Sequence, residues 1–246
     1  PLANDFRLQG QVNTKLYKSL GLYGSYRLEN KRPDLLAQFH VSNNYIWNNN
    51  FNSVLTNDLK VGLKWGAQNY LQFRTLSHNN WLYFDANSQA QQATEVVAYS
   101  QFDLRQDFEF WSWLHFDNRI VYQIPLSGQA FLPLPDLVTR NALYAEFDLF
   151  KGALACLVGG EYSYFSEFNS PSYNPALGRF YLANEYSIGN FGILDLFANF
   201  RIAKAVIFLK FENALMGFVP YNYWAAPNYP LNDRNFRVGI NWRFFN

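Results

Sequence analysis

Apolar and polar side chains alternate along the last twelve residues of the chain, 235–246. Phe236, Val238, Ile240, Trp242 and Phe244 occupy every second position, and arginine, glycine or asparagine fill the positions between them. Because successive side chains of a β-strand point to opposite faces, the pattern predicts a strand with one large apolar face. Such a strand is typical of the end of an outer-membrane β-barrel, where the apolar face meets lipid.

The same period of two recurs along the rest of the chain and predicts eleven more strands. They are expected at residues 6–16, 20–29, 36–48, 59–65, 71–75, 94–105, 109–123, 138–149, 154–164, 194–202 and 207–212. Residues 106–108 are expected to be the turn between two of them. The prediction is an all-β fold, an antiparallel transmembrane β-barrel of about twelve strands. An even number of strands would leave both termini on the periplasmic side.

The connections between these strands alternate in length. Counting back from the C-terminus, long breaks at residues 216–234, 166–191 and 124–137 alternate with short turns at 203–204, 150–151 and 106–108. Outer-membrane barrels have short periplasmic turns and long external loops. A soluble β-sandwich has no reason to keep its long loops at one end, so the alternation favours the transmembrane barrel.

The composition agrees with interleaved strands. Hydrophobic residues make up 49% and aromatic residues 20% of the chain, yet the mean hydropathy is −0.22. No apolar run approaches the roughly 18 residues of a membrane-spanning helix. No linker divides residues 1–246, which are expected to form a single barrel domain with outer-membrane lipids around it. The net charge of +1 gives no sign of a nucleic-acid partner.

Short motifs across most of the chain resemble a known family. They are Arg32, Pro33 and Asp34 with Ser42, Asn43 and Trp47; Tyr173, Asn174 and Pro175 with Gly178, Arg179 and Phe180; and Tyr229, Pro230, Asp233, Arg234, Phe236–Gly239 and Trp242–Asn246. In these positions the chain resembles the outer-membrane porins of Bacteroidetes, most closely in its C-terminal part. The resemblance implies a barrel in the cell outer membrane. Members of that family are longer, so two hypotheses remain: a complete barrel, or the C-terminal part of a larger one with more strands.

Charged side chains fall on the strand face opposite the apolar one. In lipid, Arg or Lys at mid-depth would cost about 2–4 kcal/mol, so these side chains are expected to line the lumen. The predicted lumen residues are Arg7, Arg27, Lys60, Lys64, Arg74, Asp103, Arg105, His115, Asp117, Arg119, Arg140, Glu146, Asp148, Glu161, Asp195, Arg201, Lys210, Glu212, Arg237 and Arg243.

Two functions fit a charged, slightly basic lumen. One is a porin-like channel for small polar solutes with a slight bias toward anions. The other is a barrel that is plugged by ion pairs across its lumen and serves as a structural subunit of a larger complex with other outer-membrane proteins.

Aromatic residues near the predicted strand ends suit the two membrane interfaces. The predicted interface residues are Trp111, Trp113, Tyr162, Tyr164, Trp242 and Phe244. A further aromatic group, Tyr221, Tyr223, Trp224 and Tyr229, belongs to an external loop. That group is expected to fold over the barrel mouth, and stacking on a sugar is the alternative.

Catalysis has little support in the sequence. The histidines are His40, His78 and His115, and neither a nucleophile motif nor a metal-binding motif accompanies them. His115 precedes Asp117 and Arg119 on one strand face, so an outer-membrane hydrolase is kept as a third hypothesis. We predict a protein that is not an enzyme and has no cofactor.

Overall fold

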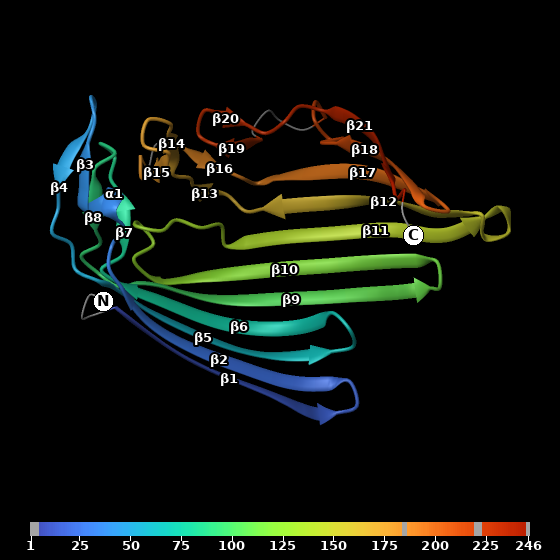
Figure 1. Ribbon diagram of the computed structural model, residues 1–246, viewed down its shortest axis with the longest axis horizontal. Helices are drawn as coiled ribbons and strands as arrows, with labels where there is room; N and C mark the ends of the chain where they lie inside the picture. The colour runs from blue at the N-terminus through green and yellow to red at the C-terminus, as the bar shows by residue number, and fades with distance from the viewer. Residues whose placement is uncertain (1–4, 184–185, 219–222, 245–246) are drawn as a thin grey trace.

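A computed structural model describes residues 5–183, 186–218 and 223–244 (Figure 1). Eleven strands form one sheet in the order of the chain, and each pairs antiparallel with the next. The strands are β1 (Phe6–Tyr17), β2 (Leu20–Lys31), β5 (Val54–Trp65), β6 (Asn69–Asn79), β9 (Val97–Trp111), β10 (Leu114–Ser127), β11 (Leu137–Leu149), β12 (Leu154–Phe165), β17 (Phe191–Ile202), β18 (Ala205–Glu212) and β21 (Asn235–Trp242).

The connections sort by length to the two ends of this sheet. The end with short connections, here called the turn end, holds residues 18–19, 66–68, 112–113, 150–153 and 203–204. The opposite end, here called the loop end, holds residues 32–53, 80–96, 128–136, 166–190 and 213–234. The predicted alternation of long and short connections is confirmed, and it extends to the N-terminal strands, where the sequence shows no clear contrast.

The predicted strand at residues 36–48 is wrong. This segment lies at the loop end and forms α1 (Leu35–Gln38) and a small hairpin of β3 (Phe39–Val41) and β4 (Ile46–Asn48). Asp34 caps the helix by accepting from the backbone N–H of Ala37 at 2.9 Å, and the indole of Trp47 donates to the carbonyl of Leu36 at 2.9 Å. Ala37 and Trp47 therefore belong to a loop core, and the segment does not form a lipid-facing strand.

Two further expectations change with it. The described residues form eleven strands of this sheet, an odd number, so β1 and β21 both run from the loop end to the turn end (Figure 1). The expected placement of both termini at one end is therefore wrong.

Residues 106–108 belong to β9, because Asp107 and Glu109 continue the polar positions while Phe108 and Phe110 continue the apolar ones. The turn that follows is at residues 112–113.

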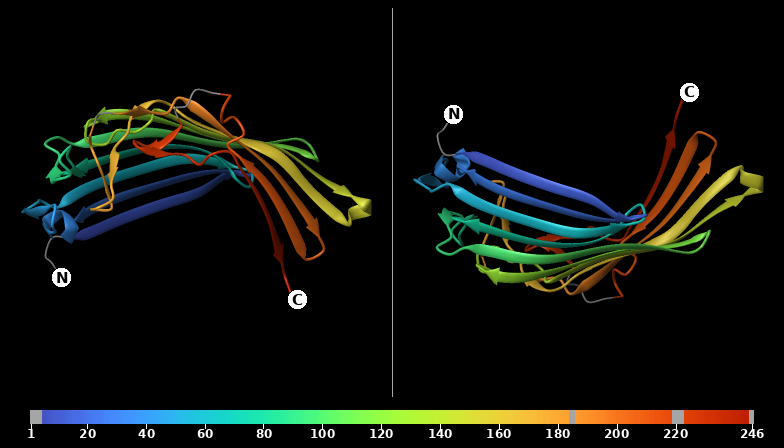
Figure 2. Two further views of the ribbon diagram at one scale, coloured as in Figure 1. Left: turned by 90° about the horizontal axis from the view of Figure 1, so that it is seen from above. Right: turned by 90° about the horizontal axis from the view of Figure 1, so that it is seen from below.

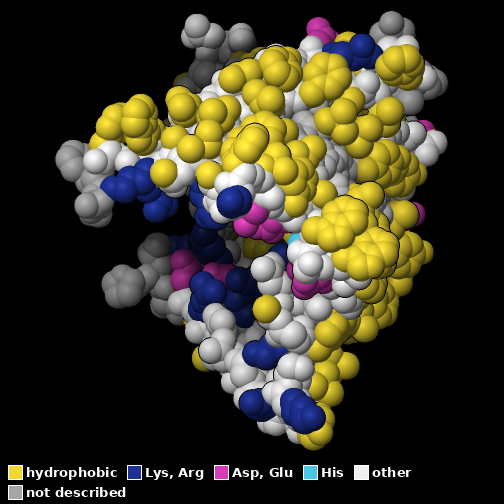
Figure 3. Space-filling model, turned by 90° about the vertical axis from the view of Figure 1, so that its right-hand side faces the viewer, with side chains coloured by type: hydrophobic (Ala, Val, Ile, Leu, Met, Phe, Trp, Pro, Cys, Tyr) yellow, Lys and Arg dark blue, Asp and Glu magenta, His cyan; other side chains and the backbone are white. Residues whose placement is uncertain are grey.

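The sheet is an open arch and not a closed cylinder (Figure 2). In the described residues β1 and β21 are not paired with each other. Apolar side chains cover the convex surface, while charged side chains gather in the hollow (Figure 3). Large apolar residues of the convex face are exposed along the whole arch, from Val12 at 67% in β1 to Val238 at 61% in β21. Soluble monomers rarely expose so large an apolar surface.

Most of the buried residues lie at the loop end. Trp47, Ala37 and Ala90 form one cluster, and Val97 forms a second cluster with Ala93 and Tyr99. Ala90 belongs to β8 (Ala90–Gln92), which pairs with β7 (Leu82–Phe84) in a small hairpin of the loop end. A second hairpin there joins β19 (Trp224–Ala226) and β20 (Tyr229–Pro230), and Ala226 is buried in it. None of the described helices is long and apolar enough to cross a membrane.

Candidate functional site

The strand register brings the charged residues together on the concave side of the arch, here called the polar face (Figure 3). Arg27 of β2 is opposite Asp58 of β5, Lys60 is opposite Arg74 of β6, and Arg119 of β10 is opposite Arg105 of β9. The predicted lumen residues all fall on this alternation, with Arg243 just past the end of β21. The polar face is therefore the candidate site.

Asp58 is the centre of one cluster on the polar face. Its carboxylate accepts two hydrogen bonds from the Arg74 guanidinium, at 2.7 and 3.0 Å, and one from Arg27 at 2.9 Å. Lys60 Nζ lies 3.9 Å from the same carboxylate. The Asp58 side chain is 4% exposed, whereas its cationic neighbours remain partly open. One buried anion thus holds together cations from three neighbouring strands.

A second cluster lies over β6, β9 and β10. Arg119 donates to both oxygens of Asp103, at 3.2 and 2.9 Å, and the Tyr70 hydroxyl donates to the same carboxylate at 3.3 Å. Arg105 reaches Asp107 at 3.4 Å. A cavity of about 250 Å³ opens among Tyr70, Arg105, Asp107, Arg119 and other side chains of the polar face. It is a hollow lined by both signs of charge.

Ion pairs continue toward the C-terminal strands. Arg140 of β11 contacts Glu161 of β12 at 2.6 Å. Lys210 of β18 lies 2.8 Å from Asp195 of β17 and 3.3 Å from Glu212, which also accepts from Arg237 of β21 at 2.9 Å. Neighbouring strands are therefore joined by charge pairs as well as by their backbone ladders.

Charges near the turn end are arranged differently. No ion pair among the described residues involves Lys64, Arg201 or Arg243, nor Glu146 or Asp148. The cations lie on strands near the two edges of the arch, and the carboxylates lie on β11 in its middle. The turn end therefore presents basic flanks around an acidic centre.

His115 lies at this acidic centre. Its ring stacks on Tyr144, with ring centroids 5.1 Å apart and an interplanar angle of 14°. The Tyr144 hydroxyl donates to Asp117 at 3.4 Å. Asp117 is thus hydrogen-bonded to Tyr144. His115 contacts the same tyrosine through ring stacking, which is an ordinary packing contact.

The sequence did not point to some residues of the polar face. Asp58 was missed because its strand was expected to begin at Leu59. Asp58 is two positions before Lys60 and therefore lies on the same face of the strand. Asp107 was missed because the turn was placed at 106–108. Glu109 was not among the predicted lumen residues, although it begins the predicted strand 109–123 and falls on the polar positions of β9. Continuing the alternation outward from each predicted strand would have found Asp58 and Asp107, and applying it from the first residue of the strand 109–123 would have found Glu109. The carboxylates of these three residues reduce the excess of positive over negative charge that the sequence predicts for the lumen.

The predicted interface aromatics lie near strand ends. Trp111 and Trp113 stack at the turn end with centroids 5.7 Å apart, and Trp242 stacks on Phe244 at 5.3 Å at the same end. Tyr162 and Tyr164 are close to the loop end of β12, where the Tyr164 hydroxyl donates to Asn190 at 3.0 Å. Their contact with a membrane interface stays a prediction. Residues 245–246 of the closing segment lie outside the described residues.

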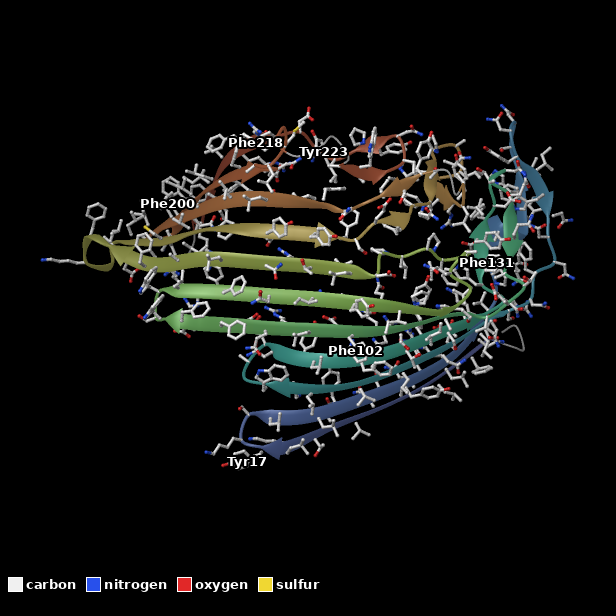
Figure 4. The ribbon with its side chains drawn as sticks, turned by 180° about the vertical axis from the view of Figure 1, so that it is seen from behind. Tyr17, Phe102, Phe131, Phe200, Phe218 and Tyr223 are labelled. Carbon is white, nitrogen blue, oxygen red and sulfur yellow. The ribbon has the colours of Figure 1, made fainter. Side chains whose placement is uncertain are left out.

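The aromatic loop residues are placed in part. Tyr221 lies outside the described residues. Tyr223 is buried at 8% exposure, and the Tyr229 ring packs edge-on against Tyr173 with centroids 5.6 Å apart. Figure 4 shows Tyr223 near the loop end of the sheet. These contacts place two of the rings within the loop layer, and sugar stacking there stays a prediction.

The loop at residues 166–190, here called the strap, crosses the concave side of the arch at the loop end (Figure 2). It starts from β12 but contacts the loops beside β5 and β6, so it passes the ends of β9, β10 and β11. In β14 (Ser172–Asn174), the Asn174 amide donates to the Tyr45 hydroxyl at 2.7 Å and to Ser88 Oγ at 2.9 Å. The backbone N–H of Leu182 donates to the carbonyl of Phe84 at 2.8 Å.

An exposed ion pair adds to this attachment. Arg179 of β15 (Arg179–Tyr181) lies 3.0 Å from Asp34. Beside the strap's contact with β7, burial and the Asp85 carboxylate raise the pKa of the Tyr83 hydroxyl, which stays neutral at physiological pH. Through these contacts the strap lies across part of the loop end of the arch.

The described residues contain no group of three or more His, Cys, Asp or Glu side chains that could hold a metal ion.

A family described as "Putative porin" matches residues 2–246. The chain belongs to this porin family. A search of curated proteins gives no match. The porin family and the sheet place the protein in the cell outer membrane, as a transport protein of the β-barrel type. The description of this family points to a protein that is not an enzyme.

Solved outer-membrane proteins share the fold. The chain is similar to the FrpB iron transporter from Neisseria meningitidis, with a TM-score of 0.67 and 13% identity over 95% of this chain and 38% of that one. It is also similar to a ferric enterobactin receptor from Pseudomonas aeruginosa in complex with enterobactin, with a TM-score of 0.61 and 9% identity over 85% of this chain and 35% of that one. The chain thus spans a little over a third of the length of each.

Proposed function

We propose that the protein is a porin-like channel for small polar solutes, and that its polar face forms part of the lumen wall of a closed barrel. The observation that carries this proposal is the separation of the two faces of the arch. The convex face is apolar from edge to edge, and the concave face holds ionised groups. Lipid outside and water inside satisfy both faces at once.

Closure of the barrel is part of the proposal. The arch leaves the hydrogen-bonding edges of β1 and β21 without a strand in the described residues, and such edges are not tolerated in the hydrocarbon core. Strands beyond these eleven would satisfy them. The chain is similar to about a third of the length of each larger protein. This supports the proposal that it forms one segment of the wall of a wide barrel, and it favours the hypothesis that the natural protein is longer.

Selectivity in this channel would be weak and toward anions. The ion pairs around Asp58, Asp103 and Glu212 neutralise much of the wall. Lys64, Arg201 and Arg243 then contribute positive charge near the turn end, but Glu146 and Asp148 oppose it. A wall of this kind favours small anions modestly and passes neutral polar solutes.

A second function is favoured by the strap. The strap is attached through the buried hydrogen bonds of Asn174 and crosses the concave side at the loop end. This arrangement would also suit a barrel whose lumen is closed and which serves as a structural subunit. In that case the partners are other outer-membrane proteins on the apolar convex face.

Planar-bilayer recording separates the two functions. The full natural protein should give discrete conductance steps, and under a salt gradient the reversal potential should shift slightly toward that of chloride. A cation-selective result would reject the anion bias and leave the channel. The absence of steps above background, from protein shown to be folded and inserted, would instead support the closed subunit.

A further inference from the structure

A second cavity lies at the loop end, away from the charged clusters of the polar face. It has a volume of about 570 Å³ and opens between the 128–136 loop and the base of the strap. Its polar lining comes from Gln129, Asp136, Glu167, Asn169 and Ser187. This volume falls within the range of pockets that hold small organic ligands.

The backbone around the cavity is held in place. The Gln123 side chain donates to the carbonyl of Pro135 at 2.7 Å, and its backbone N–H donates to the carbonyl of Asp136 at 2.7 Å. On the opposite wall, β13 (Phe168–Asn169) pairs with β16 (Ser187–Ile188). Both walls are therefore formed before any ligand arrives, which lowers the entropic cost of binding.

The polar lining is anionic. Asp136 and Glu167 contribute two carboxylates, and no Lys, Arg or His of the described residues lines the cavity. Ser187 Oγ donates to Glu167 Oε1 at 2.7 Å, which orients this carboxylate. Asp136 belongs to the 128–136 loop and Glu167 to the strap on the opposite wall, so the two carboxylates line the cavity from its two sides, where they attract a cation and repel an anion.

The remaining groups suit hydroxyls and a carbon skeleton. The amides of Gln129 and Asn169 each offer donors and an acceptor, so they can pair with hydroxyl groups in either direction. Pro133, Leu134 and Phe168 supply apolar surface on the same cavity. A ligand that uses the whole lining carries an ammonium group, several hydroxyls and a compact ring.

We propose that this cavity is a binding site for a small hydroxylated ammonium compound, of the size and chemistry of an amino sugar. The ammonium group pairs with Asp136 and Glu167, the hydroxyls pair with Gln129 and Asn169, and the ring rests on the apolar wall. This site is separate from the polar face. It does not require the barrel to conduct.

Ligand-observed NMR on the full natural protein in detergent tests the proposal, with glucosamine, glucose and glucuronate as probes at a pH where the amine is protonated. Glucosamine should bind best, glucose more weakly and glucuronate not measurably. Asp136→Asn should weaken glucosamine binding about tenfold and leave glucose nearly unchanged, because a charge-assisted hydrogen bond is lost. Asn169→Ala should weaken both sugars.

Glu95→Gln is the matched control, since Glu95 is an exposed loop carboxylate outside this cavity. It should leave binding of all three probes unchanged. The proposal is overturned if no probe binds saturably, if glucosamine and glucose bind equally, or if Glu95→Gln acts like Asp136→Asn. Bilayer conductance of Asp136→Asn should equal that of the natural protein, so failure of this site and failure of the channel function are distinguishable.

Discussion

Asp58 is the residue of the polar face on which the ion pairs of β2, β5 and β6 depend. Its nearly buried carboxylate faces two guanidinium groups and an ammonium group on three neighbouring strands. Removing a buried partner leaves the opposite charges uncompensated, and that costs more than the intact pair contributes.

Asp58→Ala should therefore destabilise the protein by about 1–3 kcal/mol, a value reduced from that of fully buried pairs because Arg27 and Arg74 are partly exposed. Urea unfolding from lipid vesicles, followed by tryptophan fluorescence, measures the change. Arg140→Ala is the matched control, since the Arg140 side chain is 68% exposed and its pair with Glu161 should contribute less than about 1 kcal/mol. Equal losses in the two variants would contradict the central role of Asp58.

Gly62 gives a second prediction at this scale, because the Tyr23 ring lies over it. A Cβ at Gly62 would come within 2.4 Å of the ring and displace the hydroxyl that donates to Gln72 at 3.2 Å. Gly62→Ala should cost about 1–3 kcal/mol in the same unfolding assay. Gly10→Ala is the control, since nothing lies within 4 Å of its added Cβ, and it should leave stability unchanged. A neutral Gly62→Ala would show that Tyr23 moves aside freely.

Individual strands were largely predictable from the sequence. The period of two specifies β11 and β12 almost to the residue, because lipid and water impose opposite polarity on alternate positions. The segment at 36–48 was not predictable in this way, because Ala37 and Trp47 are apolar for a different reason. They bury against a neighbouring loop, and a one-dimensional pattern does not distinguish a lipid partner from a loop partner.

The candidate site was predictable to the same extent. Parity placed Arg74, Asp103 and Arg119 on one face, but it did not specify which charges meet. That depends on the register between neighbouring strands, which the alternation within each strand does not specify. The strap and its attachment to Tyr45 and Ser88 depend on loop packing, for which the sequence carries no periodic signal.

The strap gives a prediction at the scale of elements. Asn174→Ala removes the buried bonds to Tyr45 and Ser88 and should loosen the strap from the loops beyond it. We expect faster proteolysis within residues 166–190 and, in bilayers, larger or noisier conductance steps.

Arg179→Ala is the control within the same strap. Both side chains of its pair with Asp34 are exposed, so its loss should change neither measurement appreciably. Unchanged proteolysis and conductance in Asn174→Ala would show that the hairpins hold the strap without this residue.

At the scale of the whole molecule, the two faces of the arch should respond oppositely to the same substitution. Leu196 and Asn199 both belong to β17, the first on the convex face and the second on the concave face. Leu196→Lys places a charge in lipid and should cost about 2–4 kcal/mol. Asn199→Lys should be tolerated, with a small gain in anion preference. Vesicle insertion and urea stability measure the first effect, and reversal potentials measure the second. Equal tolerance at both positions would contradict the assignment of lipid to the convex face.

The parallel direction of the two outermost strands limits what can complete the wall. β1 and β21 both descend from the loop end to the turn end. Two copies of this sheet inserted the same way up could therefore join edges only through parallel ladders. An antiparallel seam at both edges requires an odd number of added strands, the first and last of which climb in the opposite sense. Any closed cylinder made in that way has an even total of strands, and the added strand that follows β21 begins at the turn end.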